Sequence, residues 1–117
     1  MSGARSRRKG AVGERELAAV LTAGGFPSKR GQQYQGSPDS PDVRVPSLPR
    51  IYLECKRTER LNLYDAIAQA RQDAGDKLPI VAHRRNRCEW VAILPLVDLL
   101  AIIRESDFVQ TRKDEVT

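Results

Sequence analysis

The residues best suited to chemistry in this sequence are two carboxylates and an ammonium group: Asp42, Glu54 and Lys56. Side chains alternate between the two faces of a strand, so Glu54 and Lys56 share one face of a strand expected at 51–56, roughly 7 Å apart along it. Taken alone, such a pair is also typical of an ordinary solvent-facing strand. Its meaning therefore depends on what the chain places beside it.

Asp42 changes this interpretation. Eleven residues separate it from Glu54, and a short hairpin would bring the two together on neighbouring strands. Two adjacent carboxylates repel each other unless a cation lies between them. Hard oxygen ligands suit Mg2+, which keeps several waters and accepts phosphate oxygens. A bound Mg2+ would activate water, and Lys56 would stabilise the developing charge. The pattern predicts metal-dependent phosphodiester hydrolysis.

A second aspartate competes with Asp42 for this role, because Asp39 also follows a proline. We prefer Asp42 because the β-branched Val43 and Val45 follow it in a strand-like alternation. Asp39 lies among turn residues, where aspartate commonly caps or turns the backbone. The sequence leaves Asp39 as the alternative ligand.

A third carboxylate, Glu14, lies in a helix expected from about residue 10 to residue 23. It falls on the apolar stripe of that helix, and carboxylates rarely face a core unless they are paired or bound to metal. One interpretation is a hydrated first-turn glutamate favoured by the helix dipole. The other is a third metal ligand pointing over the sheet toward Asp42 and Glu54. Glu16, on the far side of the helical wheel, serves as its comparison.

The helices and strands expected from the sequence indicate an α/β fold, in which a mixed central β-sheet is flanked by helices. The acidic residues are expected at one edge of this sheet. Apolar periodicity and turn signals give, in order, a helix, three strands, a helix, two strands and a terminal helix. The expected helices are 10–23, 61–74 and 96–104, and the expected strands are 26–35, 41–45, 51–56, 78–82 and 89–94.

Charge points to a polyanionic partner. The formal net charge is +5 and the isoelectric point is about 9.6, which suits nucleic acid although ordinary solubility charge gives the same number. Basic residues gather in four clusters, the last of which contains Arg84 and Arg85. We expect this turn to contact DNA, with a solvated loop as the alternative.

Other features exclude function classes. The longest apolar run, 90–103, is too short and interrupted to span a bilayer, and the basic N-terminus lacks the apolar region of a secretory signal. Cys55 and Cys88 form no disulfide framework, so a cytoplasmic location is expected. With these cysteines so far apart, the single His83 cannot complete a zinc site. We expect His83 to contact phosphate or to cap a strand end.

Two polar residues near the expected site stay open. Tyr52 shares a strand face with Glu54 and is expected to line the site. Gln69, in the second helix, either assists the water or a phosphate or is simply exposed. Cys55 shares a face with Leu53 and is interpreted as packing.

Several of these motifs resemble a known family. The stretch Arg8-Lys9-Gly10-Ala11-Val12-Gly13-Glu14-Arg15-Glu16-Leu17 resembles the opening of archaeal-type Holliday junction resolvases, which belong to the PD-(D/E)XK nuclease superfamily. Pro41-Asp42 and Glu54-Cys55-Lys56 are similar to that superfamily's signature, and Gly25-Phe26 followed by Arg30 also fits. The resemblance covers about residues 8–57.

The resemblance implies a restriction-endonuclease-like core with catalytic Glu14, Asp42, Glu54 and Lys56, the three carboxylates also holding metal. It implies phosphate contacts from Arg15 and Arg30. The expected cofactor is Mg2+, for which Mn2+ can substitute, with at most two cations per site. The expected partners are branched or four-way DNA and a second copy in a homodimer, with no membrane and no small-molecule cofactor.

The expected function is therefore a metal-dependent, structure-selective endonuclease that resolves four-way (Holliday) junctions. One alternative is a PD-(D/E)XK nuclease acting on flaps, nicks or duplex. The other is a non-catalytic DNA-binding module, which would not need Asp42, Glu54 and Lys56 together. The expected parts are a flexible basic arm at 1–9, a nuclease domain at 10–105 and a polar tail at 106–117.

Overall fold

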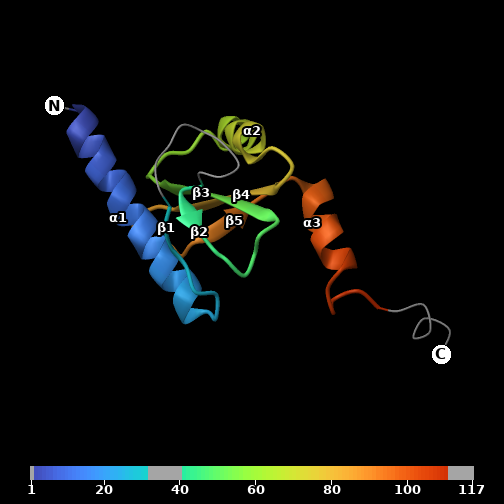
Figure 1. Cartoon of the computed structure of the whole chain (residues 1–117). Coiled ribbons are helices and arrows are strands. Elements are labelled where there is room, and N and C mark those ends of the chain that lie inside the picture. Colours follow the sequence, from blue (N-terminus) through green and yellow to red (C-terminus); the bar gives the residue numbers. More distant parts are fainter. Residues whose placement is uncertain (1, 32–40, 111–117) are drawn as a thin grey trace.

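The computed structural model (Figure 1) describes residues 2–31 and 41–110, with side chains from residue 10 onward. The elements follow the predicted order of helix, three strands, helix, two strands and helix. They are α1 (Ser2–Ala23), β1 (Lys29–Arg30), β2 (Val43–Arg44), β3 (Ile51–Arg57), α2 (Leu63–Ala74), β4 (Leu78–Arg84), β5 (Val91–Ile93) and α3 (Leu96–Arg104). Asp39 and most of the turn predicted around it lie outside the described residues.

The main sheet has the strand order β3-β4-β5 and is mixed, as predicted. β3 and β4 pair in parallel, which requires a crossover, and α2 supplies it. The start of α2 is capped by Asn62, whose side chain accepts a hydrogen bond from the N–H of Asp65 at 3.2 Å. β5 then pairs antiparallel with β4.

Both faces of β3 and β4 are covered. On one face, Leu53 and Ala82 pack with Leu17 of α1 and Val43 of β2. On the other face, Val81 packs with α2, whose buried residues are Ala66, Ala70 and Ala74. Small side chains at these three positions allow the helix to lie close to the sheet. Tyr52 and Glu54, on the α2 face of β3, are consequently removed from water.

Two predictions need correction. The helix was expected from about residue 10, with 1–9 as a separate arm, but α1 begins at Ser2. The residues before Gly10 contain good helix formers and no proline, so nothing ends the helix there. β2 was expected to pair beside β3, but it forms an antiparallel ladder with β1 instead. Both short strands are only two residues long.

α3 lies apart from the sheet (Figure 1), and none of its residues is buried. Leu96 is 68% exposed and Val97 63% exposed. The ion pair Arg71–Asp98, with 3.8 Å between its charged atoms, links this helix to α2. Within 2–31 and 41–110, no helix combines the length and apolar character needed to cross a membrane.

Candidate active site

Asp42 reaches β3 through its side chain. Its Oδ2 accepts a hydrogen bond of 2.9 Å from the backbone N–H of Cys55. Because β3 is an edge strand, the Asp42 side chain takes the place of a neighbouring strand as the acceptor for this N–H. Asp42 therefore lies beside Glu54, as predicted, although by a different contact. Gly31 permits this arrangement, because a Cβ there would lie 2.0 Å from the carbonyl oxygen of Pro41.

Glu54 lies on the α2 face of β3 and is 6% exposed. Burial raises the pKa of its carboxyl group to about 7, and the negative charge of Asp42 adds to that effect. Lys56 opposes the rise, with its Nζ 3.9 Å from Glu54 Oε2. The predicted Glu54–Lys56 pair thus exists, but it is loose and does not compensate for burial.

Glu14 is buried in the middle of α1, with 7% exposure. The interpretation as a hydrated first-turn residue is therefore wrong. Arg30 of β1 donates from Nε to Glu14 Oε1 at 2.5 Å. Burial raises the pKa of Glu14, the Arg30 hydrogen bond lowers it, and the charge of Asp42 raises it again. α1 approaches this closely at Gly13, where a Cβ would lie 2.6 Å from Arg57 Cβ.

We call Glu14, Asp42, Glu54 and Lys56 the carboxylate edge. Its three carboxylates fit a hard divalent cation chemically, because two of them are nearly buried and Asp42 raises the pKa of both. A cation among them would relieve that repulsion. Their oxygens are held by separate partners, and the described residues contain no ready group of three acidic, histidine or cysteine ligands.

α2 contributes a residue that the sequence did not single out, Asp73. Its charge raises the pKa of both Tyr52 and Glu54. Tyr52 is 2% exposed, so it lies under the site and not on its surface. Gln69, four residues before Asp73 on the same flank of α2, is exposed. Two features of the sequence could have indicated Asp73: its spacing of four residues from Gln69, and its position just before the small, buried Ala74.

No family model and no curated protein matches this sequence. Among solved structures, the chain is similar to Hjc, a Holliday junction resolvase from Archaeoglobus fulgidus. The TM-score is 0.52 at 23% sequence identity, and the alignment covers 70% of this chain and 74% of that chain. The chain has the fold of an archaeal Holliday junction resolvase. This confirms the predicted restriction-endonuclease-like α/β fold.

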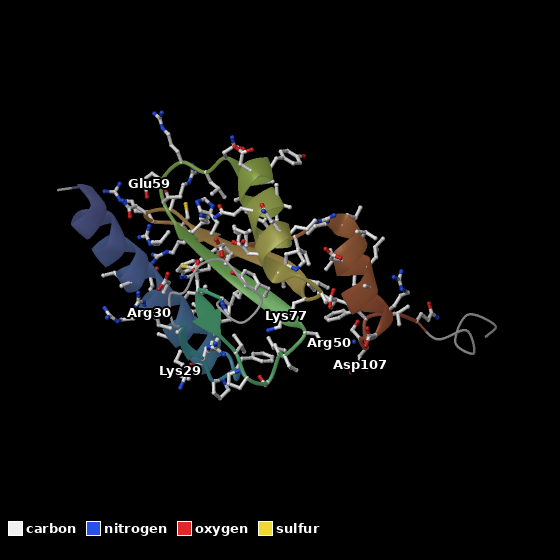
Figure 2. All side chains as sticks on the ribbon, turned by 45° about the horizontal axis from the view of Figure 1, so that its top comes forward. Lys29, Arg30, Arg50, Glu59, Lys77 and Asp107 are labelled. Atoms are coloured by element: carbon white, nitrogen blue, oxygen red, sulfur yellow. The ribbon has the colours of Figure 1, made fainter. Side chains whose placement is uncertain are left out.

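In this resolvase fold, two of the predicted phosphate-binding arginines lie together. Arg15 and Arg30 line an open hollow of about 560 Å³, and Lys29 joins them there. Figure 2 shows Lys29 and Arg30 beside the C-terminal half of α1, well away from Glu59. Glu14 lies behind this surface, bonded to Arg30. A basic surface thus borders the carboxylate edge.

The other two predicted arginines differ from each other. Arg85 is exposed in the β4–β5 turn, and its Nε donates to Cys88 Sγ at 3.3 Å. Arg84 is engaged within the protein: its Nε donates to the carbonyl oxygen of Cys88 at 2.5 Å, and its Nη1 forms an ion pair with Glu16. Of the pair, Arg85 is the one placed to meet a ligand.

The carboxyl ends of β3 and β4 carry a second polar network, which we call the arginine cluster: Glu16, Arg57, Glu59 and Arg84. Arg57 lies 3.4 Å from Glu16 and 3.7 Å from Glu59 between charged atoms. Arg84 also pairs with Glu16. Glu16 was expected on the free side of the helix, but it joins α1 to the sheet. That expectation is wrong.

The remaining candidates have structural surroundings. His83 Nε2 is 2.9 Å from the carbonyl oxygen of Thr58, which ties β4 to the end of β3. Both cysteines are free. Cys55 packs against the core, and burial raises the pKa of its thiol to about 12. A thiol that stays protonated is a poor nucleophile, so Cys55 is a packing residue.

Proposed function

We propose that this protein is a Mg2+-dependent DNA endonuclease that resolves four-way (Holliday) junctions by phosphodiester hydrolysis. The observation that carries the proposal is the carboxylate edge, in which Glu14, Asp42 and Glu54 act on one another's charge beside Lys56. The fold shared with an archaeal resolvase supports this choice of reaction and substrate.

The residues of the edge take distinct roles. Glu14, Asp42 and Glu54 would hold Mg2+, for which Mn2+ can substitute. When bound, the cation supplies an activated water and a Lewis acid toward the phosphate. The N–H of Cys55 fixes the orientation of Asp42. Lys56, whose side chain is 31% exposed, can reach a phosphate oxygen and stabilise the charge that develops on it.

The DNA backbone would be held by basic residues outside the edge. Arg15 and Arg30 border it on the α1 side, and the exposed Arg85 lies on the β4–β5 turn. A guanidinium group binds phosphate with paired hydrogen bonds, so these side chains position the substrate. We assign Arg84 to holding that turn, because its donors are used within the protein.

We further propose that the protein acts as a homodimer. A four-way junction needs two opposed cuts, which a two-fold dimer provides. α3 is apolar and has no buried residue, and an exposed apolar helix of this kind marks an interface. A separate apolar hollow of about 500 Å³ lies between α1, β2 and the sheet, and Trp90 and Val91 line part of it.

Light scattering tests the dimer. We expect a mass twice the 13.1 kDa of the chain and a monomer after Leu100→Glu on α3. Tyr64→Glu is the matched control, because Tyr64 is an exposed apolar residue of α2. A wild-type monomer that still cuts junctions in pairs contradicts the proposal.

A panel of labelled DNAs tests the function. Four-way junctions, flaps, nicked duplexes and intact duplexes are incubated with Mg2+, Mn2+ or EDTA. We expect paired cuts in the junction with either cation and none in EDTA. Preferential cutting of flaps or nicks would instead identify a nuclease with another DNA substrate. Tight binding without any cutting would identify a DNA-binding module.

A further inference from the structure

The bond between Glu14 and Arg30 joins the carboxylate edge to the protein surface. Glu14 is 7% exposed, whereas the side chain of Arg30 is 36% exposed. Arg30 also lines the open hollow that it shares with Arg15 and Lys29. One guanidinium group therefore contacts a buried carboxylate and is accessible to a ligand arriving from solution.

The three carboxylates are held to different degrees. Glu54 has a loose ion pair, with 3.9 Å to Lys56. Asp42 is bonded to a backbone N–H. Glu14 accepts a short, charge-assisted hydrogen bond from Arg30, with Oε1 2.5 Å from Nε. A cation that recruits Glu14 must first break a charge-assisted hydrogen bond, which is among the stronger kinds.

We propose that Arg30 is a positioning residue that withholds Glu14 from the metal site until a DNA phosphate takes the place of Glu14 on the guanidinium. This inference rests on the proposed nuclease function. A phosphate entering the hollow offers Arg30 two anionic oxygens, and bidentate binding of phosphate is favourable for arginine. Once released, Glu14 has lost its bond to Arg30 and faces the repelling charge of Asp42. Cation binding then relieves that repulsion.

The consequence is that DNA and the divalent cation bind cooperatively. Coupling between two ligands is reciprocal, so DNA tightens cation binding by the same factor by which the cation tightens DNA binding. In the DNA-free protein, the cation site is then incomplete. Such an arrangement would limit hydrolysis to the moment when a phosphate occupies the arginine.

Arg15 provides a matched control, because it neighbours Glu14 in the chain, is exposed, and lowers the pKa of Glu14 through its charge. Arg15→Gln and Arg30→Gln remove the same charge from the same surface. Only the second removes the 2.5 Å bond to Glu14. The difference between the two variants therefore isolates the bond from general electrostatics.

The first experiment measures Mn2+ affinity without DNA, from the electron paramagnetic resonance signal of free Mn2+. We expect Arg30→Gln to bind Mn2+ about tenfold more tightly than wild type, within the usual range of coupling between sites, and Arg15→Gln to differ by less than about twofold. In a Glu14→Gln background, Arg30→Gln should have no larger effect than Arg15→Gln. Equal effects of the two arginine variants in the wild-type background would overturn the inference.

A second experiment needs no change at Arg30 and so does not depend on the folding of that variant. DNA affinity is measured in EDTA by fluorescence anisotropy for wild type, Glu14→Gln and Asp42→Asn. Both variants remove one negative charge from the edge, but only Glu14→Gln frees Arg30. We expect Glu14→Gln to bind DNA about fivefold more tightly than Asp42→Asn, the lower end of typical coupling. Equal affinities contradict the inference.

The two proposals fail differently. If wild type binds Mn2+ and cuts DNA but Arg30→Gln and Arg15→Gln behave alike, the gating role of Arg30 is wrong and the nuclease function stands. If Mn2+ binds to no variant, with or without DNA, the proposed function fails and this inference fails with it.

Discussion

Two glutamates on α1, two residues apart, lie in opposite electrostatic situations. Glu14 belongs to the carboxylate edge, where it and Glu54 are buried and the negative charge of Asp42 raises the pKa of both. Glu16 belongs to the arginine cluster, where Glu16 and Glu59 face Arg57 and Arg84. The same helix thus joins an edge in which buried carboxylates raise one another's pKa and a cluster in which glutamates pair with arginines.

This difference indicates that the carboxylate edge is a functional site, whereas the arginine cluster is a structural joint that holds α1 against the sheet. In the arginine cluster each charge has an opposite partner, so no further ligand is needed to hold α1 against β3 and β4. In the carboxylate edge, burial and the charge of Asp42 raise the pKa of Glu14 and Glu54. Burying mutually repelling carboxylates lowers the stability of the protein. This is typical of functional positions, because a ligand site without its ligand is destabilising. The comparison predicts that the two regions respond to mutation in different observables.

The largest effect is expected at the centre of the edge. Asp42→Asn and Glu54→Gln should each reduce junction cleavage by about 100-fold or more, because each removes an anionic ligand of the cation that stabilises the transition state. DNA binding should be retained or slightly tightened. Gel analysis of labelled junctions measures the cuts, and Asp76→Asn, an exposed aspartate in the turn after α2, is the control. If either edge variant cuts junctions at a near wild-type rate, the residue changed in that variant is not part of the catalytic site.

Glu14 and Glu16 are expected to separate activity from stability. Glu14→Gln should lose cleavage by a large factor while its unfolding free energy in EDTA changes less than that of Glu16→Gln, because the lost bond to Arg30 is offset by removal of a buried carboxylate that Asp42 repels. Glu16→Gln should cut DNA normally when folded but lose about 1–3 kcal/mol of stability, the usual cost of deleting one partner of charged hydrogen bonds. Urea unfolding measures stability and cleavage assays measure activity. Identical behaviour of the two variants would contradict the assignment of Glu14 to the site and of Glu16 to the fold.

The sequence predicted the carboxylate edge better than the arginine cluster, for a physical reason. Glu14 was recognisable because a carboxylate on an apolar helical stripe conflicts with local periodicity. The position of Asp42 followed from a turn and a strand-like alternation. Glu16 conflicts with nothing locally, and its partner Arg84 is 68 residues away. Local patterns do not show which distant arginine reaches a glutamate.

The fold was predictable to a similar extent. Periodicity and turn signals together predicted the order of the eight elements in the described residues, and the mixed sheet was predicted as well. What failed were contacts that depend on tertiary geometry. Asp42 reaches the backbone of Cys55 through its side chain, and Asp73 acts on Glu54 across the helix–sheet interface. A pattern of residue types along the chain does not show that either pair of residues is close in space.

The pH dependence of stability should come from the edge. Glu54 has a pKa raised to about 7 from its ordinary value of 4.5, so between these values the folded state binds a proton that the unfolded state has released. Stability in EDTA therefore falls as pH rises through this window. We expect the melting temperature to drop by about 4 °C or more between pH 5 and pH 7.5, measured by circular dichroism.

Three comparisons sharpen that pH experiment. Glu54→Gln should flatten the pH dependence, whereas Glu16→Gln should lower the melting temperature at every pH without changing its slope. Added Mg2+ should raise the melting temperature most above pH 7, because the cation binds the ionised carboxylate. A wild-type melting temperature that rises from pH 5 to pH 7.5 would contradict the assignment of a buried, repelled carboxyl group to Glu54.

The smallest effect is expected at the β4–β5 turn, where Arg84 and Arg85 repeat the comparison between a joint and a contact surface. Arg85 is exposed, so Arg85→Gln should leave stability unchanged and reduce the slope of log affinity against log salt by about one, as loss of one phosphate contact requires. Arg84→Gln should do the reverse, because Arg84 is bonded to Glu16 and to the carbonyl of Cys88. It should lower stability and leave the salt slope nearly unchanged. Anisotropy titrations at several salt concentrations measure both slopes. If Arg84→Gln changes the slope as much as Arg85→Gln does, then Arg84 leaves Glu16 to bind DNA, and the arginine cluster takes part in substrate binding as well as in the fold.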